Sequence, residues 1–295
     1  VKRGAARIMS WKDFSKLVKM RLTFLVVFSA SISYIIGAKM SGGINWYDWG
    51  KLVIGGFLVT AAANCFNEII EKDLDKLMRR TMDRPMPAGR MTTSQGLVLG
   101  LGMGMFGTYL LGSLNLLTGL LSVFSILLYA FASTPFKRKS PIAVFVGAIP
   151  GALPPLIGYV AAHGKVDTIA ALLFLIQFVW QFPHFWAIAW VLDDDYKLAG
   201  FRLLPSGKRD LTSAIFAFAS TLILIPVSLL PTYYGYGGYY VGGVSLICGL
   251  VFLYLAFKLL KDLQIASAKK LMYGSFFYLP VVQLMFLFDF IGKVK

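Results

Sequence analysis

Nine long apolar runs constrain this chain more than any other feature of its sequence. They cover about residues 22–38, 52–70, 95–112, 115–133, 141–162, 168–192, 211–230, 239–258 and 271–291. A run of roughly 20 apolar residues is long enough to cross the hydrocarbon core of a bilayer as a helix. The runs lack the alternation of a barrel strand, and backbone in lipid must satisfy its own hydrogen bonds. The sequence therefore predicts one all-α membrane domain over residues 1–295, with nine transmembrane helices.

Lysine and arginine residues indicate how this domain is oriented. The N-terminal segment and the loops that follow the even-numbered helices carry 24 of the 29 basic residues, and the other side carries five. Because cytoplasmic loops are enriched in Lys and Arg, we expect these segments in the cytoplasm and the C-terminus outside. The expected location is the inner (cytoplasmic) membrane. The net charge of +15 then mainly reflects the orientation of the helices, with some attraction to anionic lipid head groups. Nucleic-acid binding would need a soluble basic face, and the sequence shows none.

The acidic residues concentrate in two blocks. The first is "NEIIEKDLDKLMRRTMDRP", after the second apolar run, and the second is "VLDDDYKLAGFRLLPSGKRD", after the sixth. Both blocks fall on the predicted cytoplasmic side. We therefore expect the two loops to face one another across a shared cavity.

The first block places oxygen-bearing side chains on one helical face. Asn67, Glu71 and Asp75 are spaced four residues apart, and Asn64 and Arg79 extend the same stripe. Mg²⁺ commonly takes one or two carboxylates and leaves its other positions to water and phosphate oxygens. The stripe therefore predicts a metal site.

Basic residues follow this stripe directly. Arg79, Arg80 and Arg84 are placed to bind phosphate oxygens next to the metal. The alternative, a solvated helix end with salt bridges, explains the charges. It does not explain Asn64 and Asn67, which lie deeper in the apolar run, where polar groups are usually functional.

The second block offers further ligands. Asp194 and Asp195 are the preferred metal ligands, whereas Asp193 is either solvated or functional. Lys197 is a candidate for the phosphate. In "STPFKRKSP", after the fourth helix, Lys137 and Arg138 are either a positive-inside anchor or phosphate contacts, and the two roles are compatible.

The sixth run contains "QFVWQFPHFWAIAW", in which Gln181 and His184 flank Pro183. These residues fit a pocket wall better than a lipid-facing surface. The fifth run contains Pro150, Pro154 and Pro155, and we expect them to break the helix beside a cavity. The cytoplasmic rim and this pocket would together suit a long apolar substrate with a diphosphate head.

The first motif resembles that of a known family. The spacing Asn67-x-x-x-Glu71-x-x-x-Asp75 is similar to the first acidic motif of the UbiA superfamily of intramembrane prenyltransferases, with Glu71 where many members have Asp. The stretches "RTMDRPMPAGR", "STPFKRKSPIAVFVGAIPGALPPLIGY", "WQFPHFWAIAW" and "DDDYKLAGFRLLP" resemble its heme O synthase branch, the protoheme IX farnesyltransferases.

One feature departs from the wider superfamily. Its second motif is Asp-x-x-x-Asp, but the positions four residues from Asp195 and Asp193 are Val191 and Lys197. The form Asp-Asp-Tyr that ends at Tyr196 is typical of the heme branch. The departure leaves open which aspartate touches the metal.

The resemblance implies a UbiA-type fold of nine helices around a central cavity and an enzyme that farnesylates heme. Farnesyl diphosphate and heme b would be its substrates, heme O its product after water addition, and Mg²⁺ its cofactor. It also implies contact with heme A synthase or oxidase assembly proteins. The implied metal ligands are Asn67, Glu71, Asp75, Asp194 and Asp195. The implied diphosphate-binding residues are Arg79, Arg84, Lys137, Arg138 and Lys197. The implied heme-pocket residues are Asn64, Trp180, Gln181 and His184, although a hydrogen-bonded structural role for His184 stays open.

Two other functions are compatible with parts of the sequence. A prenyltransferase that acts on a quinone precursor or another aromatic would keep the first motif but would not need "WQFPHFW". A secondary transporter would also have broken helices, but it would carry charges near the midplane and inverted repeats. Here the acidic residues cluster at one rim. A purely structural role would leave the acidic stripe unexplained.

Overall fold

The computed structural model describes residues 10–134 and 141–292, and all regular elements within these ranges are helices. The helices are α1 (Trp11–Leu17), α2 (Met20–Met40), α3 (Trp46–Asp75), α4 (Thr93–Gly112), α5 (Leu116–Leu127), the π-helix η1 (Leu128–Ser133), α7 (Ala143–His163), α8 (Thr168–Val191), α9 (Asp193–Leu198), α10 (Leu211–Tyr233), α11 (Tyr239–Asp262) and α12 (Ile265–Phe288). An isolated bridge joins Gly237 to Phe290. The all-α prediction is confirmed for the described residues.

Nine apolar helices correspond to the nine predicted spans in the described part of the chain. Eight are long enough to cross a membrane: α2, α3, α4, α7, α8, α10, α11 and α12. The predicted span at 115–133 is a shorter apolar helix, Leu116–Ala132, formed by α5 and η1. The helices extend beyond several apolar runs, because a helix needs only its middle to match the hydrocarbon core. Helix α3, for example, begins at Trp46, where the Asn45 side chain accepts hydrogen bonds from two backbone N–H groups.

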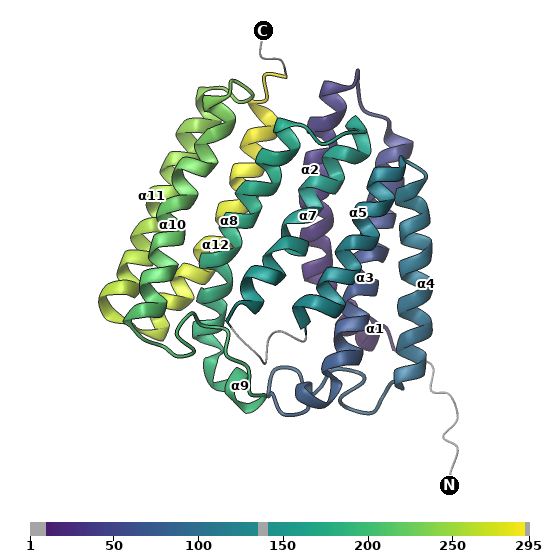
Figure 1. The fold of residues 1–295 in the computed structure, drawn as a ribbon, viewed down its shortest axis with the longest axis vertical. Helices are drawn as coiled ribbons and strands as arrows, with labels where there is room; N and C mark the ends of the chain where they lie inside the picture. The colour runs from purple at the N-terminus through teal and green to yellow at the C-terminus, as the bar shows by residue number, and fades with distance from the viewer. Residues whose placement is uncertain (1–9, 135–140, 293–295) are drawn as a thin grey trace.

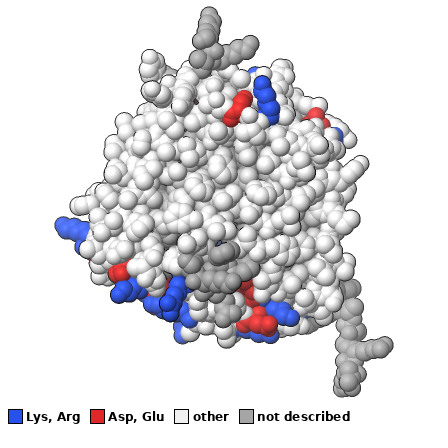
Figure 2. Space-filling model, viewed as in Figure 1, with Lys and Arg blue, Asp and Glu red and all other residues white. Residues whose placement is uncertain are grey.

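The long helices run side by side between two ends of the molecule (Figure 1). Helix α3 packs on α4, α2 on α7, α7 on α8, and α8 on both α10 and α12. The short helices α1 and α9 lie at one end, and α12 ends at the other (Figure 1). Charged side chains gather at both ends and leave a broad uncharged band between them (Figure 2). Such a band is expected of a surface that faces lipid.

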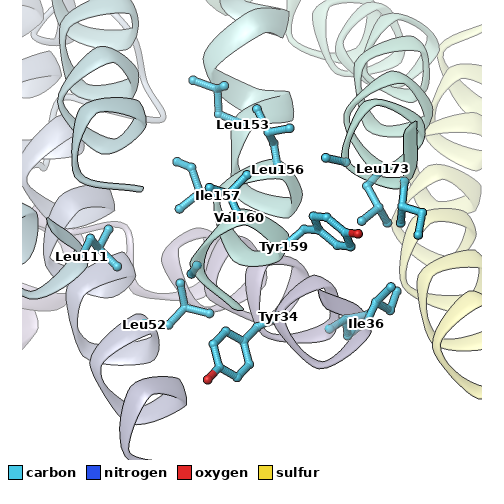
Figure 3. Packing of buried hydrophobic residues seen from close by; sticks show 14 of the residues in the cluster. Tyr34, Ile36, Leu52, Leu111, Leu153, Leu156, Ile157, Tyr159, Val160 and Leu173 are labelled. Atoms are coloured by element: carbon cyan, nitrogen blue, oxygen red, sulfur yellow. The ribbon is translucent and has the colours of Figure 1, made fainter. Parts of the chain in front are cut away.

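Helices α2 and α7 approach each other closely at glycines. A Cβ on Gly37 would lie 2.6 Å from the carbonyl oxygen of Tyr159, and a Cβ on Gly158 would meet the carbonyl of Ala30. Small residues allow such approaches between membrane helices. Around this contact the side chains of α2, α3, α4, α7 and α8 form one apolar cluster (Figure 3). This packing holds α2 and α3, and hence the site described below, in a fixed relation.

The prolines of α7 do not interrupt it, so the predicted break is wrong. The helix is continuous from Ala143 to His163 although Pro155 cannot donate to the carbonyl of Gly151. The Gln177 amide donates to that carbonyl instead, at 2.7 Å, and the Gln181 amide donates to the carbonyl of Ala148, at 2.9 Å. Neighbouring helices commonly restore the hydrogen bonds that prolines remove in membranes.

Candidate active site

The last three turns of α3 carry the predicted stripe of oxygen-bearing side chains. Asn67, Glu71 and Asp75 are buried, with exposed fractions of 1%, 4% and 0%. The Asn67 amide donates to Glu71 Oε2, at 2.9 Å, and to Thr134 Oγ1, at 3.0 Å. Asp73 is exposed and pairs with Lys76. The prediction that these three side chains share a face, and that Asp73 lies on another, is confirmed.

Among the residues that the structure describes, Lys19 and Arg84 contact the stripe. Lys19 Nζ donates to Asn67 Oδ1, at 3.0 Å, and lies 3.4 Å from the Tyr129 hydroxyl. Arg84 NH1 donates to Asp75 Oδ2, at 2.6 Å, in a pair whose side chains are 13% and 1% exposed. Paired charges of this kind are what allows a carboxylate to be buried. The predicted Arg84 therefore lies at the stripe, together with Lys19, which the sequence did not single out.

The loop between α3 and α4 folds back over the end of α3. Thr81 Oγ1 donates to the Asp75 carbonyl, at 3.0 Å, and the Met86 N–H donates to Glu68 Oε1, at 3.1 Å. Glu68 is fully buried, and its Oε2 has no hydrogen-bond partner in the described part of the chain. The sequence analysis gave Glu68 no role, although this acidic residue directly follows Asn67 in the sequence.

Ion pairs also tie this loop to α1. Lys16 and Arg90 pair with Asp83, and Arg90 pairs with Asp13, at 2.9 Å. Hydrogen bonds from Lys16 and Arg90 lower the pKa of Asp83 from its ordinary value of 3.8. The loop is thus held at both α1 and α3.

The second acidic block contacts the first, whereas the cavity expected between the two loops stays a prediction. Asp195 accepts hydrogen bonds from the backbone N–H groups of Arg79, at 2.7 Å, and Arg80, at 3.3 Å. Helix α3 ends at Asp75, so Arg79 does not continue its stripe; the Arg79 side chain is exposed. The segment that follows α3 is therefore held by α9.

The other aspartates of α9 form ion pairs. Asp193 is buried and pairs with Lys197, at 2.6 Å, and the exposed Asp194 pairs with Arg209, at 3.0 Å. Metal binding by Asp194 and Asp195, and diphosphate binding by Arg79 and Lys197, stay predictions. Lys137 and Arg138 lie outside the described residues.

The donor atoms of the stripe suit a hard divalent cation. Asp75 Oδ1 is buried and has no hydrogen-bond partner in the described ranges. In those ranges no three His, Cys, Asp or Glu side chains form a ready cage for a metal. A site with two carboxylates and one amide oxygen is compatible with Mg²⁺, which keeps water or phosphate oxygens as further ligands. The residues present therefore fit the predicted metal.

The predicted heme-pocket residues do not form one cluster of contacts. Trp180 and His184 stack at 4.4 Å, and both reach Ser275 of α12: Trp180 Nε1 donates to its carbonyl, and His184 Nδ1 lies 2.7 Å from its Oγ. Gln181 binds α7, as described above. Asn64 donates to the Val18 carbonyl, at 3.1 Å. Trp180 and His184 stack on each other, whereas Gln181 donates a hydrogen bond to α7 and Asn64 donates one to the turn before α2.

The fold and the site define a polytopic helical membrane protein with a buried acid and amide stripe, paired with basic side chains, at one end. The sequence matches the UbiA prenyltransferase family over residues 26–281. The chain belongs to this family.

Named relatives cover nearly the whole chain. It is 44% identical over 281 residues to the protoheme IX farnesyltransferase of Cytophaga hutchinsonii, which covers 95% of this chain and 98% of that protein. It is 43% identical over 289 residues to the protoheme IX farnesyltransferase of Christiangramia forsetii, and the match covers 97% of this chain and 95% of that protein.

Solved structures share the fold. A structure of digeranylgeranylglyceryl phosphate synthase has a TM-score of 0.79 at 20% identity and covers 94% of this chain and 97% of that one. A UbiA homologue from Archaeoglobus fulgidus, bound to GPP and Mg²⁺, has a TM-score of 0.68 at 10% identity. The match covers 93% of this chain and 99% of that one. At these identities the likeness shows the UbiA fold alone.

Proposed function

We propose that this chain transfers the farnesyl group of farnesyl diphosphate to a vinyl group of heme b and that water addition then gives heme O. The observation that carries the proposal is the buried stripe of Asn67, Glu71 and Asp75, with Lys19 and Arg84 in contact with it. The names of the relatives support the acceptor. The GPP and Mg²⁺ bound to a neighbour of the same fold support the donor and the metal.

The residues of the stripe would act on the diphosphate end. Asn67, Glu71 and Asp75 would hold Mg²⁺, with Asp194 or Asp195 as further ligands from α9. When bound, Mg²⁺ supplies Lewis acidity toward the leaving diphosphate. Arg84 would give up part of its contact with Asp75 Oδ2 and add its positive charge to that of the metal. Arg79, Lys137, Arg138 and Lys197 are proposed to bind the remaining diphosphate oxygens.

Stabilising the diphosphate allows the allylic C–O bond to break, with its electron pair leaving on oxygen. The π electrons of the heme vinyl group then form the new C–C bond. Water adds to the resulting cation and loses a proton, which gives the hydroxyl of the product. The surrounding apolar helices would keep bulk water from the farnesyl cation.

His184 is proposed to hold the heme, next to Trp180. Ser275 Oγ donates to the Met272 carbonyl, at 2.5 Å, so it accepts from His184 Nδ1–H. Nε2 then carries the lone pair, which heme iron can accept. Asn64 and Gln181 stay predicted pocket residues, and contact with heme A synthase or oxidase assembly proteins stays a prediction.

Turnover by the purified protein tests the proposal. Farnesyl diphosphate and heme b are supplied with Mg²⁺ or with EDTA, and the porphyrin is measured by mass spectrometry. We expect a Mg²⁺-dependent mass gain of one farnesyl group plus water. Diphosphate release only with a quinone precursor would keep the site and reject heme as acceptor. No consumption of farnesyl diphosphate with either acceptor would reject the transferase and favour a transporter.

A further inference from the structure

The chain makes an unusual turn directly before the first membrane helix. Between α1 and α2, Lys19 adopts a left-handed conformation, with φ 48° and ψ 57°. Lys19 and Leu263 are the two residues other than glycine with positive φ in the described ranges. Such a conformation is strained for a residue with a Cβ, and strained residues persist where the surrounding structure holds them, often at functional sites.

Buried polar contacts hold this turn. The Val18 carbonyl accepts hydrogen bonds from Thr23 Oγ1, at 2.6 Å, and from the Asn64 amide of α3, at 3.1 Å. Asn64 also donates to Thr23 Oγ1, at 3.3 Å. These contacts account for Asn64 inside an apolar run, because it ties α3 to the start of α2. Asn64 thereby sets where Lys19 lies relative to Asn67, one helical turn along α3.

The turn brings the Lys19 ammonium to the one oxygen of Asn67. Asn67 Nδ2 donates to Glu71 and Thr134, so Oδ1 is the only acceptor of its side chain, and Lys19 donates to it. The neighbouring basic residues lie elsewhere: Lys16 pairs with Asp83, and Arg21 is exposed. Its position therefore distinguishes Lys19 from the neighbouring basic residues Lys16 and Arg21.

We propose that Lys19 is a diphosphate-binding residue whose ammonium exchanges with Mg²⁺ at Asn67 Oδ1. This inference rests on the proposed function. A metal bound to Asn67 must take the oxygen that Lys19 holds, and two cations at such short range repel each other. A lysine has a flexible four-carbon stem, so its ammonium can turn to the diphosphate that arrives with the metal. Lys19 would thus stabilise the stripe before the metal binds and the leaving diphosphate afterwards.

Binding of Mn²⁺, a spectroscopic substitute for Mg²⁺, tests the exchange without turnover. The full-length protein is titrated with Mn²⁺ and followed by the loss of the free-ion EPR signal, first alone and then with inorganic pyrophosphate. In Lys19→Met, we expect Mn²⁺ to bind roughly tenfold more tightly without pyrophosphate, because a competing charged hydrogen bond is gone. Pyrophosphate should bind roughly tenfold more weakly in the presence of Mn²⁺. Loss of structure alone would not tighten metal binding.

Two further variants control this result. Lys19→Arg keeps the charge and should keep both affinities within about threefold. Arg21→Met removes a charge two residues away, on an exposed side chain, and should change neither affinity by more than about twofold. If the wild type binds Mn²⁺ normally and Lys19→Met binds it equally well or more weakly, the proposed role of Lys19 is overturned, but the proposed function is not. A wild type that binds neither Mn²⁺ nor pyrophosphate would overturn the proposed function as well.

Acetylation of the wild-type protein gives a second measurement that needs no variant. Lys19 modification by acetic anhydride is quantified by mass spectrometry, with Lys12, an exposed lysine of α1, as the internal reference. Exchange predicts more Lys19 modification with Mn²⁺ alone and less with Mn²⁺ and pyrophosphate together. The same extent of modification under all three conditions would contradict the exchange.

Discussion

At the scale of single residues, the site combines buried acceptors with cations from distant parts of the chain. Asn67 donates a hydrogen bond to Glu71 within α3. Lys19, which precedes α3 in the sequence, and Arg84, which follows it, both contact the stripe. Asn67 Oδ1, Glu71 Oε2 and Asp75 Oδ2 each accept a hydrogen bond, which stabilises these desolvated oxygens, whereas Asp75 Oδ1 has no partner in the described ranges. The stripe is therefore organised before any metal binds.

Glu71→Gln should remove turnover without unfolding the protein. Glutamine keeps the size of the side chain and an oxygen near Asn67, but it lacks the negative charge that a divalent cation needs. We expect a decrease in turnover of roughly a hundredfold or more, with little change in thermal stability. Asp73→Asn is the matched control, because Asp73 is an exposed acid two residues along the same helix. Near-normal turnover in Glu71→Gln would refute the metal role.

At the scale of elements, polar contacts between helices restore what prolines and turns remove. Gln177 is the centre of one such set: its amide donates to Gly151 of α7, and its Oε1 accepts from Ser29 of α2 and Gln283 of α12. Gln177 belongs to α8, so α2, α7, α8 and α12 meet at this one buried side chain. Because no water competes for these groups in the membrane, the set favours a single arrangement of the helices.

Gln177→Leu should destabilise this arrangement. The change removes the partner of the Gly151 carbonyl and of the Ser29 hydroxyl, whereas the Gln283 amide still donates to Ser29 Oγ. One buried unsatisfied group costs about 1–3 kcal/mol. Thermal unfolding in detergent measures the effect. Gln264→Leu is the control, because Gln264 is exposed and makes no side-chain cap to α12. Equal stability of the two variants would mean that the Gln177 contacts add nothing to the fold.

The ion pairs between α1 and the loop should depend on pH. Their stabilisation is fully present above the ordinary pKa of Asp83 and is lost as pH falls through its lowered pKa. In Asp83→Asn, we expect faster hydrogen exchange of the α1 amides than in the wild type at pH 7. The ratio of the two rates should approach one as the pH falls below the lowered pKa of Asp83, where the wild-type carboxylate is protonated too. Asp73→Asn, which removes an acid that does not contact α1, should leave the ratio unchanged; an Asp83→Asn ratio of one at pH 7 would contradict the prediction.

At the scale of the whole molecule, the two ends differ in what they carry. The stripe of α3, the helix α9 and the short α1 lie at one end, and the C-terminus of α12 lies at the other (Figure 1). On the face shown in Figure 2, an uncharged band lies between the two ends. The active end is predicted to face the cytoplasm, where farnesyl diphosphate would reach it as a charged molecule that does not cross the bilayer.

Cysteine labelling in spheroplasts tests this orientation. Ser41 follows α2 and Ser94 lies in the first turn of α4, at opposite ends of these helices, and both are exposed. We expect a membrane-impermeant maleimide to label Ser41→Cys in intact spheroplasts and Ser94→Cys only after permeabilisation. The reverse pattern would place the active end outside.

The class of fold and the stripe could be predicted from patterns along the chain. Apolar runs of bilayer length, the four-residue spacing from Asn67 to Asp75 and the alternation of basic residues are local or additive properties, so they can be read along the chain. The partners of the site residues became clear only from the packing of the helices. Lys19 reaches Asn67, Asp195 binds the segment after α3, and Gln177 repairs α7 across the fold. These contacts depend on how helices pack and where each one ends, and on one strained turn, which spacing along the sequence does not encode.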